Sequence, residues 1–580
     1  LGDILVSQKV SKKKFFWLSL SLILVFVLSF HTTTREWSQD LGRHLKLGEI
    51  ILKEHDLPRT NLFSYTFPDF PFANHHWLAE VVFYLLYQAG GDPALVAFKT
   101  FLFAAAFGII FFLTANRENA FLSFSALILP LLVFRERTDV RPEIFGFFFF
   151  SFYLLIFAKS LAGKKRWLYL LPVCQAFWVN CHLSFVFGNL LLAAYLFYLW
   201  RERKLLSRQS IPVVLALLAN FINPHGLKGA LAPFMIWENY GYEIAENQSI
   251  FFLAKFGGFR NIFFFKLCFA LVLSTFIFLR RDGLLFAVWL ALAGAAAWQI
   301  RHFPFFALFS FFVLGRNLPF LWAKVNPVLG KKLKPALIIF NLFIFAFFTI
   351  FYASNRYYLI NDREASFGWG EEKEARAGAE FFKAHFAPGT HFFNNFDIGS
   401  FFAGCLWPQW PVFTDSRPEA YPVEFWEEYR QAQANEEAWE KLVAKWQIEA
   451  VFVFHHDQTP WFRTFLNRLY HDPLWKLVYL DDAVVIFTSS PKTDAIVLEE
   501  NKLAAENSSS RGLVSLANFF QVVGDEEKAF WFFKKAYEVN AFSYRANLGL
   551  ANYYLSSPDS ALNFAGQKFL RRLKSPLFWF

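Results

Sequence analysis

Long hydrophobic blocks, separated by short clusters of Lys and Arg, constrain this chain more than any other feature. A membrane-crossing helix needs about 20 mostly apolar residues, and about eleven blocks of the sequence approach that length. The hydrophobic share of the 580 residues is 56% and the charged share 18%, against about 25% charged residues in soluble domains. We therefore predict an integral membrane protein with spans at 15–31, 94–115, 119–134, 143–161, 167–181, 182–200, 211–224, 261–279, 283–299, 302–320 and 335–353.

The basic clusters predict how the chain crosses the membrane. Short cytoplasmic loops carry an excess of Lys and Arg, so "SQKVSKKK" before the first block places the N-terminus in the cytoplasm. The segment 75–91, "HHWLAEVVFYLLYQAGG", is either a further span or an interfacial helix. If it were a span, all the later basic loops would lie on the outer side of the membrane, against this rule. We therefore predict that it lies on the membrane surface, which leaves 159–166, 200–209 and 323–335 in the cytoplasm.

This topology gathers polar residues on the outer side of the membrane. Ionisable groups at the ends of spans are costly unless they serve a function, so their convergence indicates a site. The net charge of +10 does not indicate nucleic-acid binding, because the basic residues lie between apolar blocks in the pattern of membrane topology. The outer loops predicted in this way contain "TREWSQD", "RERTDVRPE", "WVNCH", "NPHG" and "QIRH".

From about residue 354 the composition becomes that of a folded domain outside the membrane. Strands alternating with helices indicate a small α/β domain, which we place at 354–499. Helices are predicted at 371–386, 397–406 and 422–446, strands at 390–396, 410–414 and 448–454, and a hairpin-like strand pair at 474–490.

The last segment, 500–580, shows a repeating pattern of residues that the α/β part lacks. Ala517 and Phe520 recur as Ala551 and Tyr554, a period of 34 residues that is typical of tetratricopeptide helix pairs. A single repeat followed by a weaker one indicates a helical end. Its helices either dock a protein partner or simply pack against one another.

Several stretches together resemble the GT-C class, the integral-membrane glycosyltransferases that use lipid-phosphate-linked sugars. An anchoring first span leads into a loop, 32–93, that resembles the first outer loop of bacterial members. The stretches "RERTDVRPEIFGFFFF", "WVNCHLSFVFG" and "NNFDIGSFFAGCLWPQWPVFTDSRPEAY" add to the resemblance, which covers the layout of residues 1–490.

The resemblance implies a polytopic α-helical fold of about eleven transmembrane helices in residues 1–353. An extracytoplasmic α/β domain and a tetratricopeptide-like helical end would follow it. In that class an acidic residue of the first outer loop acts as general base or positions the acceptor, and Asp40 matches it here. A second acidic position in the next outer loop is matched by Asp139, although no tandem acidic pair stands at residue 40. The implied catalytic residues are therefore Asp40 and Asp139.

Transfer of a sugar from a lipid phosphate requires a carboxylate near the acceptor and cations near the leaving phosphate, for which Arg is well suited. Each candidate also has an ordinary structural explanation: Asp40 begins a predicted helix and would suit its N-cap, and the arginines could reach lipid headgroups. In the C-terminal part, Asp397, Asp415, Arg417 and Tyr421 are predicted to be structural. The candidate substrate-binding residues are His44, Arg137, Arg141, His182, Arg301 and His302.

The sequence thus favours an enzyme of the cell envelope, in the prokaryotic cytoplasmic (inner) membrane, with the C-terminal domain outside. It would move a sugar from a polyprenyl-phosphate-linked donor to an extracytoplasmic glycan, lipid or protein. No metal ligands are assigned, and a divalent cation stays open as a cofactor. Two alternatives remain: a non-catalytic scaffold or degenerate GT-C protein that presents the tail to a protein partner, and a lipid-linked glycan transporter. A transporter would carry polar groups at mid-span, whereas here they stand at span ends.

Overall fold

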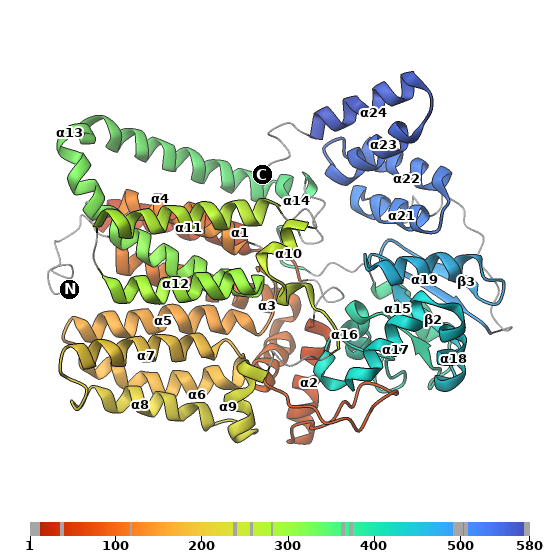
Figure 1. The fold of residues 1–580 in the computed structure, drawn as a ribbon, viewed down its shortest axis with the longest axis horizontal. Coiled ribbons are helices and arrows are strands. Elements are labelled where there is room, and N and C mark those ends of the chain that lie inside the picture. Colours follow the sequence, from red (N-terminus) through yellow and green to blue (C-terminus); the bar gives the residue numbers. More distant parts are fainter. Residues whose placement is uncertain are drawn as a thin grey trace.

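The helices of the computed structural model form a bundle of long, nearly aligned helices beside a smaller α/β part and a helical end (Figure 1). The structure describes residues 12–34, 40–115, 119–135, 137–235, 241–255, 259–279, 282–360, 366–370, 375–490, 503 and 509–573. The helices of the bundle and its connections are α1 (Lys12–Phe30), α2 (Leu41–Glu54), α3 (Trp77–Thr114), α4 (Ala120–Phe134), α5 (Glu143–Leu161), α6 (Leu171–Cys181), α7 (Phe185–Arg201), α8 (Ser210–Leu218), α9 (Gly226–Met235), α10 (Ile250–Lys255), α11 (Phe259–Leu279), α12 (Gly283–Trp298), α13 (Phe303–Ala353) and α14 (Arg356–Ile360).

The interior of the bundle is built largely from phenylalanine. Phe30, Phe103 and Phe107 each lie within 5.5 Å of the ring centre of Phe134, and Phe147 packs against the same ring at 5.0 Å. All of these side chains are buried. Edge-to-face aromatic pairs of this kind add to the energy of burial, and buried Leu, Ile, Val and Ala side chains pack around them.

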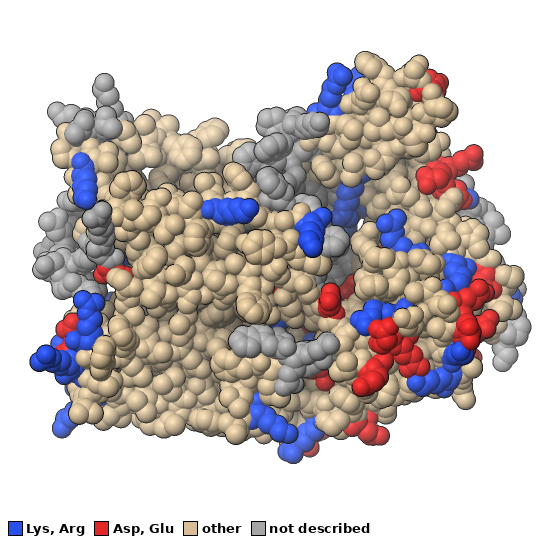
Figure 2. All heavy atoms as spheres, in the orientation of Figure 1, with Lys and Arg blue, Asp and Glu red and all other residues tan. Residues whose placement is uncertain are grey.

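Among the described residues, five helices are long and apolar enough to cross a membrane, or six if a bent pair counts as one span. Figure 2 shows why the bundle is the membrane part: the visible face of its helices carries few charges, Lys and Arg gather at the end where the N-terminus lies, and both signs of charge cover the α/β part. The chain is an integral membrane protein. The predicted number of eleven spans is not confirmed, because several of the apolar helices are shorter than a full crossing.

Helix α3 changes direction where the sequence predicted an interfacial helix to end and a span to begin. Gly90 and Gly91 are not helical, and Gly91 has a φ of 61°, a conformation that glycine adopts without the steric penalty of a Cβ atom. The kink divides α3 into a first part that contains residues 77–89 and a second part that contains the apolar block. Whether the first part lies on a membrane surface stays a prediction.

Two predicted features of the bundle are wrong in detail. The span predicted at 211–224 is interrupted, because α8 is followed by a short 3-10 turn (Ala219–Phe221) and the chain then bends by 91° into α9. The cytoplasmic loop predicted at 323–335 is helical, and α13 runs through it as one bent element (Figure 1). Strong helix formers such as Leu and Lys dominate that stretch, and they outweigh its prolines.

The α/β part contains a four-stranded sheet with the order β1-β2-β4-β3. Strand β1 (Phe392–Phe393) runs parallel to β2 (Ala450–Phe454), while β4 (Val484–Thr488) pairs antiparallel with both β2 and β3 (Lys476–Leu480). Every residue of β2 and β4 is buried, so their sequences read as continuous apolar runs. The helices of this part are α15 (Arg376–His385), α16 (Phe396–Cys405), α17 (Val423–Ala434), α18 (Glu436–Trp446) and α19 (Pro460–His471).

The stretch 410–414, predicted as a strand of this sheet, instead pairs with the first loop. Val412 donates its backbone N–H to Phe63 at 2.9 Å and accepts from Tyr65 at 3.1 Å. The helix predicted at 422–446 is likewise two helices, because the side chain of Asn435 accepts from the backbone N–H of Ala438 and caps α18. The pairing at Val412 ties residues 60–70 of the first loop to the α/β part.

The chain ends in two helix pairs, α21 (Ser510–Val522) with α22 (Glu526–Val539) and α23 (Tyr544–Ser556) with α24 (Ser560–Leu573). Gly549 of α23 lies directly against the ring of Phe533, where a Cβ atom would come within 2.5 Å of the ring. The absence of a side chain at Gly549 therefore lets α23 pack closely against α22. The assignment to the tetratricopeptide class and the domain boundaries at 353 and 499 stay predictions.

Candidate active site

Asp40 lies at the start of α2 without capping it. Its side chain makes no cap hydrogen bond to the helix, so the ordinary structural explanation of this carboxylate is wrong. The carboxylate is about one-quarter exposed, with Arg43 at 3.6 Å. It accepts hydrogen bonds from Ser416 and, at 3.4 Å, from Ser400. Asp40 is therefore held by residues more than 350 positions away in the sequence.

The two serines belong to the "NNFDIGSFF…TDSRPEAY" region, which packs onto the first loop through close backbone contacts. A Cβ atom on Gly399 would lie 2.0 Å from the carbonyl oxygen of Thr414, and one on Gly404 would lie 2.8 Å from the backbone of Gly42. These glycines let α16 approach both its own following segment and α2. The α/β part thus completes the surroundings of Asp40.

The charge of Asp40 is stabilised by its neighbours. Burial by itself would raise the pKa of the carboxyl group, but the positive charges of Arg43 and Arg141, together with His44 and the hydrogen bond from Ser416, lower this pKa to about 2. Asp40 is consequently ionised at neutral pH. Such a carboxylate is a strong hydrogen-bond acceptor and a weak base, which suits it to orienting a hydroxyl or amine.

A second cluster, formed by Arg137, Arg141 and Glu246, lies beside the first. The carboxylate of Glu246 accepts from Arg137 at 2.8 Å and from Arg141 at 2.7 Å. Glu246 stands in a short 3-10 helix (Ala245–Asn247), and the side chain of the adjacent Asn247 accepts from Arg301 at 2.7 Å. Two arginines of one loop, Arg137 and Arg141, and the distant Arg301 therefore converge on one short segment.

Arg141 links the two clusters and both predicted acidic residues. Burial opposes its charge, but the negative charges of Glu246, Asp40 and Asp139 raise the pKa of its guanidinium. The charges of Asp40 and Asp139 thus both act on Arg141, and the catalytic roles assigned to the two carboxylates stay predictions. The structure brings together Asp40, Asp139, Arg137, Arg141 and, through Asn247, Arg301.

His44 is buried against a carboxylate of α3. Its Nδ1 lies 2.8 Å from Glu80, which is fully buried in α3, and Glu80 also accepts from Asn74 at 2.5 Å. Arg43 is 3.8 Å from the same carboxylate. Glu80 therefore orients two residues that flank Asp40, and nothing in the local sequence pattern singled it out.

His182 and His302 are each hydrogen-bonded to a nearby residue and packed against an aromatic ring. The Nδ1 of His182 pairs with the hydroxyl of Ser184 at 2.8 Å, and its ring lies 5.4 Å from that of His76. His302 lies over Phe187 and hydrogen-bonds to the carbonyl of Ala295 at 3.2 Å. Both histidines have local partners at the edge of the cluster, so a role in binding a substrate stays a prediction.

Arginines pair with the carboxylates of Asp40 and Glu246 in this region. In the part of the chain that the structure describes, no group of three or more His, Cys, Asp or Glu side chains is placed to hold a metal ion. Glu246 is paired with two arginines and Asp40 lies beside Arg43. Whether a divalent cation serves as cofactor stays open, as it was in the sequence.

Two of the four C-terminal residues that the sequence assigned to structure, Asp415 and Arg417, form a buried ion pair. Arg417 is buried, binds both carboxylate oxygens of Asp415, at 2.8 and 2.5 Å, and donates to Asn61 of the first loop at 2.6 Å. Its guanidinium lies 4.5 Å from the ring centre of Phe72. The flanking residue Ser416 is thereby fixed next to Asp40.

Replacing Glu80 with Gln is expected to lower the activity of the site by about 10- to 100-fold, through the orientation of His44 and Arg43. The pKa of His44 is already lowered by burial and by Arg43, and Glu80 opposes this shift; in the variant this pKa should fall further. The measurement is the pH profile of activity in wild type and variant. A profile of unchanged shape and height would contradict the role of Glu80.

The bundle with its long first loop and following α/β part has the fold of the GT-C class of integral-membrane glycosyltransferases, as the sequence resemblance predicted. The oligosaccharyltransferase AglB from Archaeoglobus fulgidus, in complex with an inhibitory peptide and a dolichol-phosphate, matches with a TM-score of 0.54 at 12% identity, over 90% of this chain and 86% of AglB. ArnT from Cupriavidus metallidurans in the apo state matches with a TM-score of 0.51 at 12% identity, over 83% of this chain and 98% of ArnT. No family model and no curated protein matches the sequence.

Proposed function

We propose that the protein is a membrane glycosyltransferase that moves a sugar from a polyprenyl-phosphate-linked donor to an acceptor outside the cytoplasm. The observation that carries this proposal is geometric: the carboxylate of Asp40 lies 3.6 Å from Arg43, and Arg137, Arg141 and Arg301 converge on the segment 246–247. The charge of Arg141 also stabilises the ionised form of Asp40. AglB, which shares the fold, has been solved with a dolichol-phosphate. A carboxylate next to a set of arginines is the pairing that such a reaction requires.

The acceptor's oxygen or nitrogen would attack the anomeric carbon of the donor sugar. As that bond forms, the bond between the sugar and the phosphate oxygen breaks, and the polyprenyl phosphate leaves with the electron pair. Asp40 would accept a hydrogen bond from the acceptor and receive its proton as positive charge develops on the attacking atom. Asp139 would support the charge of Arg141, which faces both carboxylates.

Arg137, Arg141 and Arg301 would stabilise the leaving phosphate. Guanidinium groups suit this role because they stay charged when buried and donate in pairs. Glu246 keeps Arg137 and Arg141 charged and pointed toward one place. His44, His182 and His302 would contribute hydrogen bonds to the bound substrates. The basic loops 159–166 and 200–209 would lie in the cytoplasm, and the site and α/β part outside a prokaryotic inner membrane, in the cell envelope.

The test uses the purified full chain in nanodiscs with a radiolabelled polyprenyl-phosphate hexose and an extract of envelope glycans. We expect release of polyprenyl phosphate that depends on the extract, and a loss of at least about tenfold in donor affinity on replacing Arg141 with Gln. Donor binding without turnover of any acceptor would favour the scaffold instead. If the protein shows no donor binding and no turnover, the proposal is overturned.

A further inference from the structure

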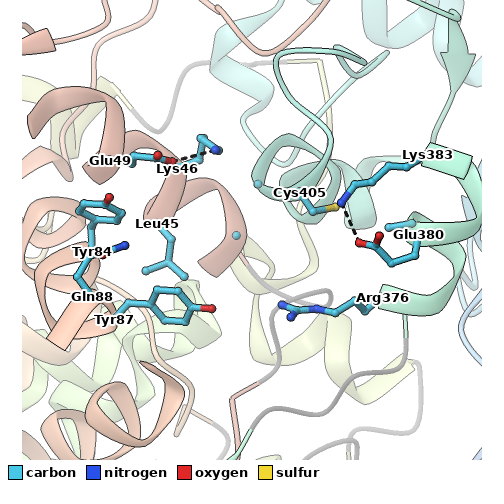
Figure 3. A pocket seen from close by; sticks show the side chains of 13 residues that line it. Leu45, Lys46, Glu49, Tyr84, Tyr87, Gln88, Arg376, Glu380, Lys383 and Cys405 are labelled. Atoms are coloured by element: carbon cyan, nitrogen blue, oxygen red, sulfur yellow. Dashed lines mark hydrogen bonds and ion pairs between the residues drawn. The ribbon is translucent and has the colours of Figure 1, made fainter. Parts of the chain in front are cut away.

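A cavity of about 330 Å³ lies between the first loop and the α/β part, on the face of α2 next to the one that carries Arg43 and His44. Figure 3 shows its two walls: α2 and α3 on one side, α15 and α16 on the other. Gly42 and Gly404, whose backbones touch, line it as well. Its volume falls within the range of about 300–1,000 Å³ that is typical of small-molecule sites.

Among the described residues that line the cavity, three side chains are cationic and two are anionic. Lys46, Arg376 and Lys383 face two carboxylates, and both carboxylates are engaged by lysines. Glu49 binds Lys46 at 2.8 Å, and Glu380 binds Lys383 at 2.8 Å. Glu49 also binds Lys53, which lies outside the cavity, at 2.5 Å. An anionic ligand would therefore be attracted, and the internal pairs hold the lysines in place for it.

The opposite wall offers aromatic rings and an amide. Tyr84, Tyr87 and Gln88 line the cavity from the first part of α3, just before the kink. In Figure 3, Tyr87 and Arg376 point toward one another across the opening. Aromatic rings with a polar tip provide flat contact surface together with a hydrogen bond. Planar polar groups such as the amide and guanidinium match pairs of neighbouring hydroxyl groups.

We propose that this cavity binds an acidic saccharide, and that this saccharide is part of the acceptor. Rings to pack against sugar faces, an amide for hydroxyl groups and an excess of cations for a carboxylate or phosphate are all present in one cavity. The assignment to the acceptor rests on the proposed function. It follows from position, because Gly42 in the cavity wall is two residues from Asp40, and α16 contributes both Cys405 to the cavity and Ser400 to Asp40.

The experiment measures binding of a galacturonic acid trimer, as the acidic probe, and maltotriose, as the neutral one, to the full chain in nanodiscs. We expect the acidic trimer to bind about tenfold more tightly than the neutral one, and binding to weaken by about tenfold in Arg376→Gln and in Tyr87→Ala. Lys441→Gln is the matched control, because Lys441 is exposed on α18, outside the cavity lining.

Binding of polyprenyl phosphate in the same variants separates this inference from the proposed function. If the variants bind polyprenyl phosphate normally and lose the acidic trimer, both proposals stand. Equal binding of the two trimers, no binding of either, or binding that is unchanged in both variants would overturn the saccharide site and leave the donor reaction intact. Retained trimer binding without any polyprenyl phosphate binding in the wild type would count against the donor reaction alone.

Discussion

Replacing Asp40 with Asn is expected to reduce sugar transfer by about 100- to 10,000-fold, the range that a positioned acid–base group contributes. The amide has nearly the same shape and can still accept from Ser416 and Ser400. It lacks the negative charge that faces Arg43 and Arg141, and it cannot take a proton from the acceptor. The measurement is transfer from a polyprenyl-phosphate hexose at saturating donor, so that a loss in turnover is not confused with a loss in donor binding.

The matched control is Asp56→Asn, because Asp56 lies in the same loop but is exposed, and its carboxylate accepts a hydrogen bond from the backbone N–H of Leu57. Since the pKa of Asp40 is lowered to about 2, its carboxylate stays ionised as the pH falls from 7 to 4. Asp40 should therefore cause no loss of activity in that range, and the Asn variant should be impaired throughout it. Equal turnover in Asp40→Asn and wild type would remove Asp40 from the mechanism.

The pattern of apolar blocks predicted most of the bundle, because burial in lipid demands length and hydrophobicity that a sequence displays directly. The prediction failed where a helix continues through a stretch that is not apolar. The stretch 323–335 contains prolines and lysines, yet α13 continues through it. The break at Gly90 and Gly91, in contrast, was visible in the sequence, because two adjacent glycines between an amphipathic and an apolar segment mark a turn.

The candidate site was predicted in part. Asp40, Asp139, Arg137 and Arg141 could be found because they stand in loops between spans, where charges are otherwise costly. Glu246, Glu80 and Ser416 were missed. Glu246 lies in a segment without regular periodicity, Glu80 looks like a surface residue of an amphipathic helix, and Ser416 reaches Asp40 only through the packing of α16 on α2. Contacts between positions so far apart in the chain leave no trace in local spacing, so only the fold reveals them.

Replacing Arg417 with Leu is expected to destabilise the α/β part by about 3–5 kcal/mol, because it leaves the carboxylate of Asp415 buried without its counter-charge. Asp415 is fully buried and accepts two hydrogen bonds from the guanidinium. The same change removes the contact between Arg417 and Asn61, which joins the α/β part to the first loop. Ser416 stands between Asp415 and Arg417 in the chain, so its hydrogen bond to Asp40 should weaken as well. Sugar transfer should therefore fall even at temperatures where the variant is still folded.

Thermal unfolding and limited proteolysis in nanodiscs measure the effect. Lys441→Gln is the control for loss of an exposed ion pair, which should leave the unfolding temperature nearly unchanged. The double variant Arg417→Leu with Asp415→Leu separates burial of a lone charge from loss of the pair. Because two apolar side chains need no counter-charge, the double variant should recover much of the stability while the link to Asn61 stays broken. If the single variant unfolds at the wild-type temperature, the ion pair does not hold the two parts together. If the double variant recovers stability without activity, the link between the parts matters for the placement of Asp40 rather than for folding.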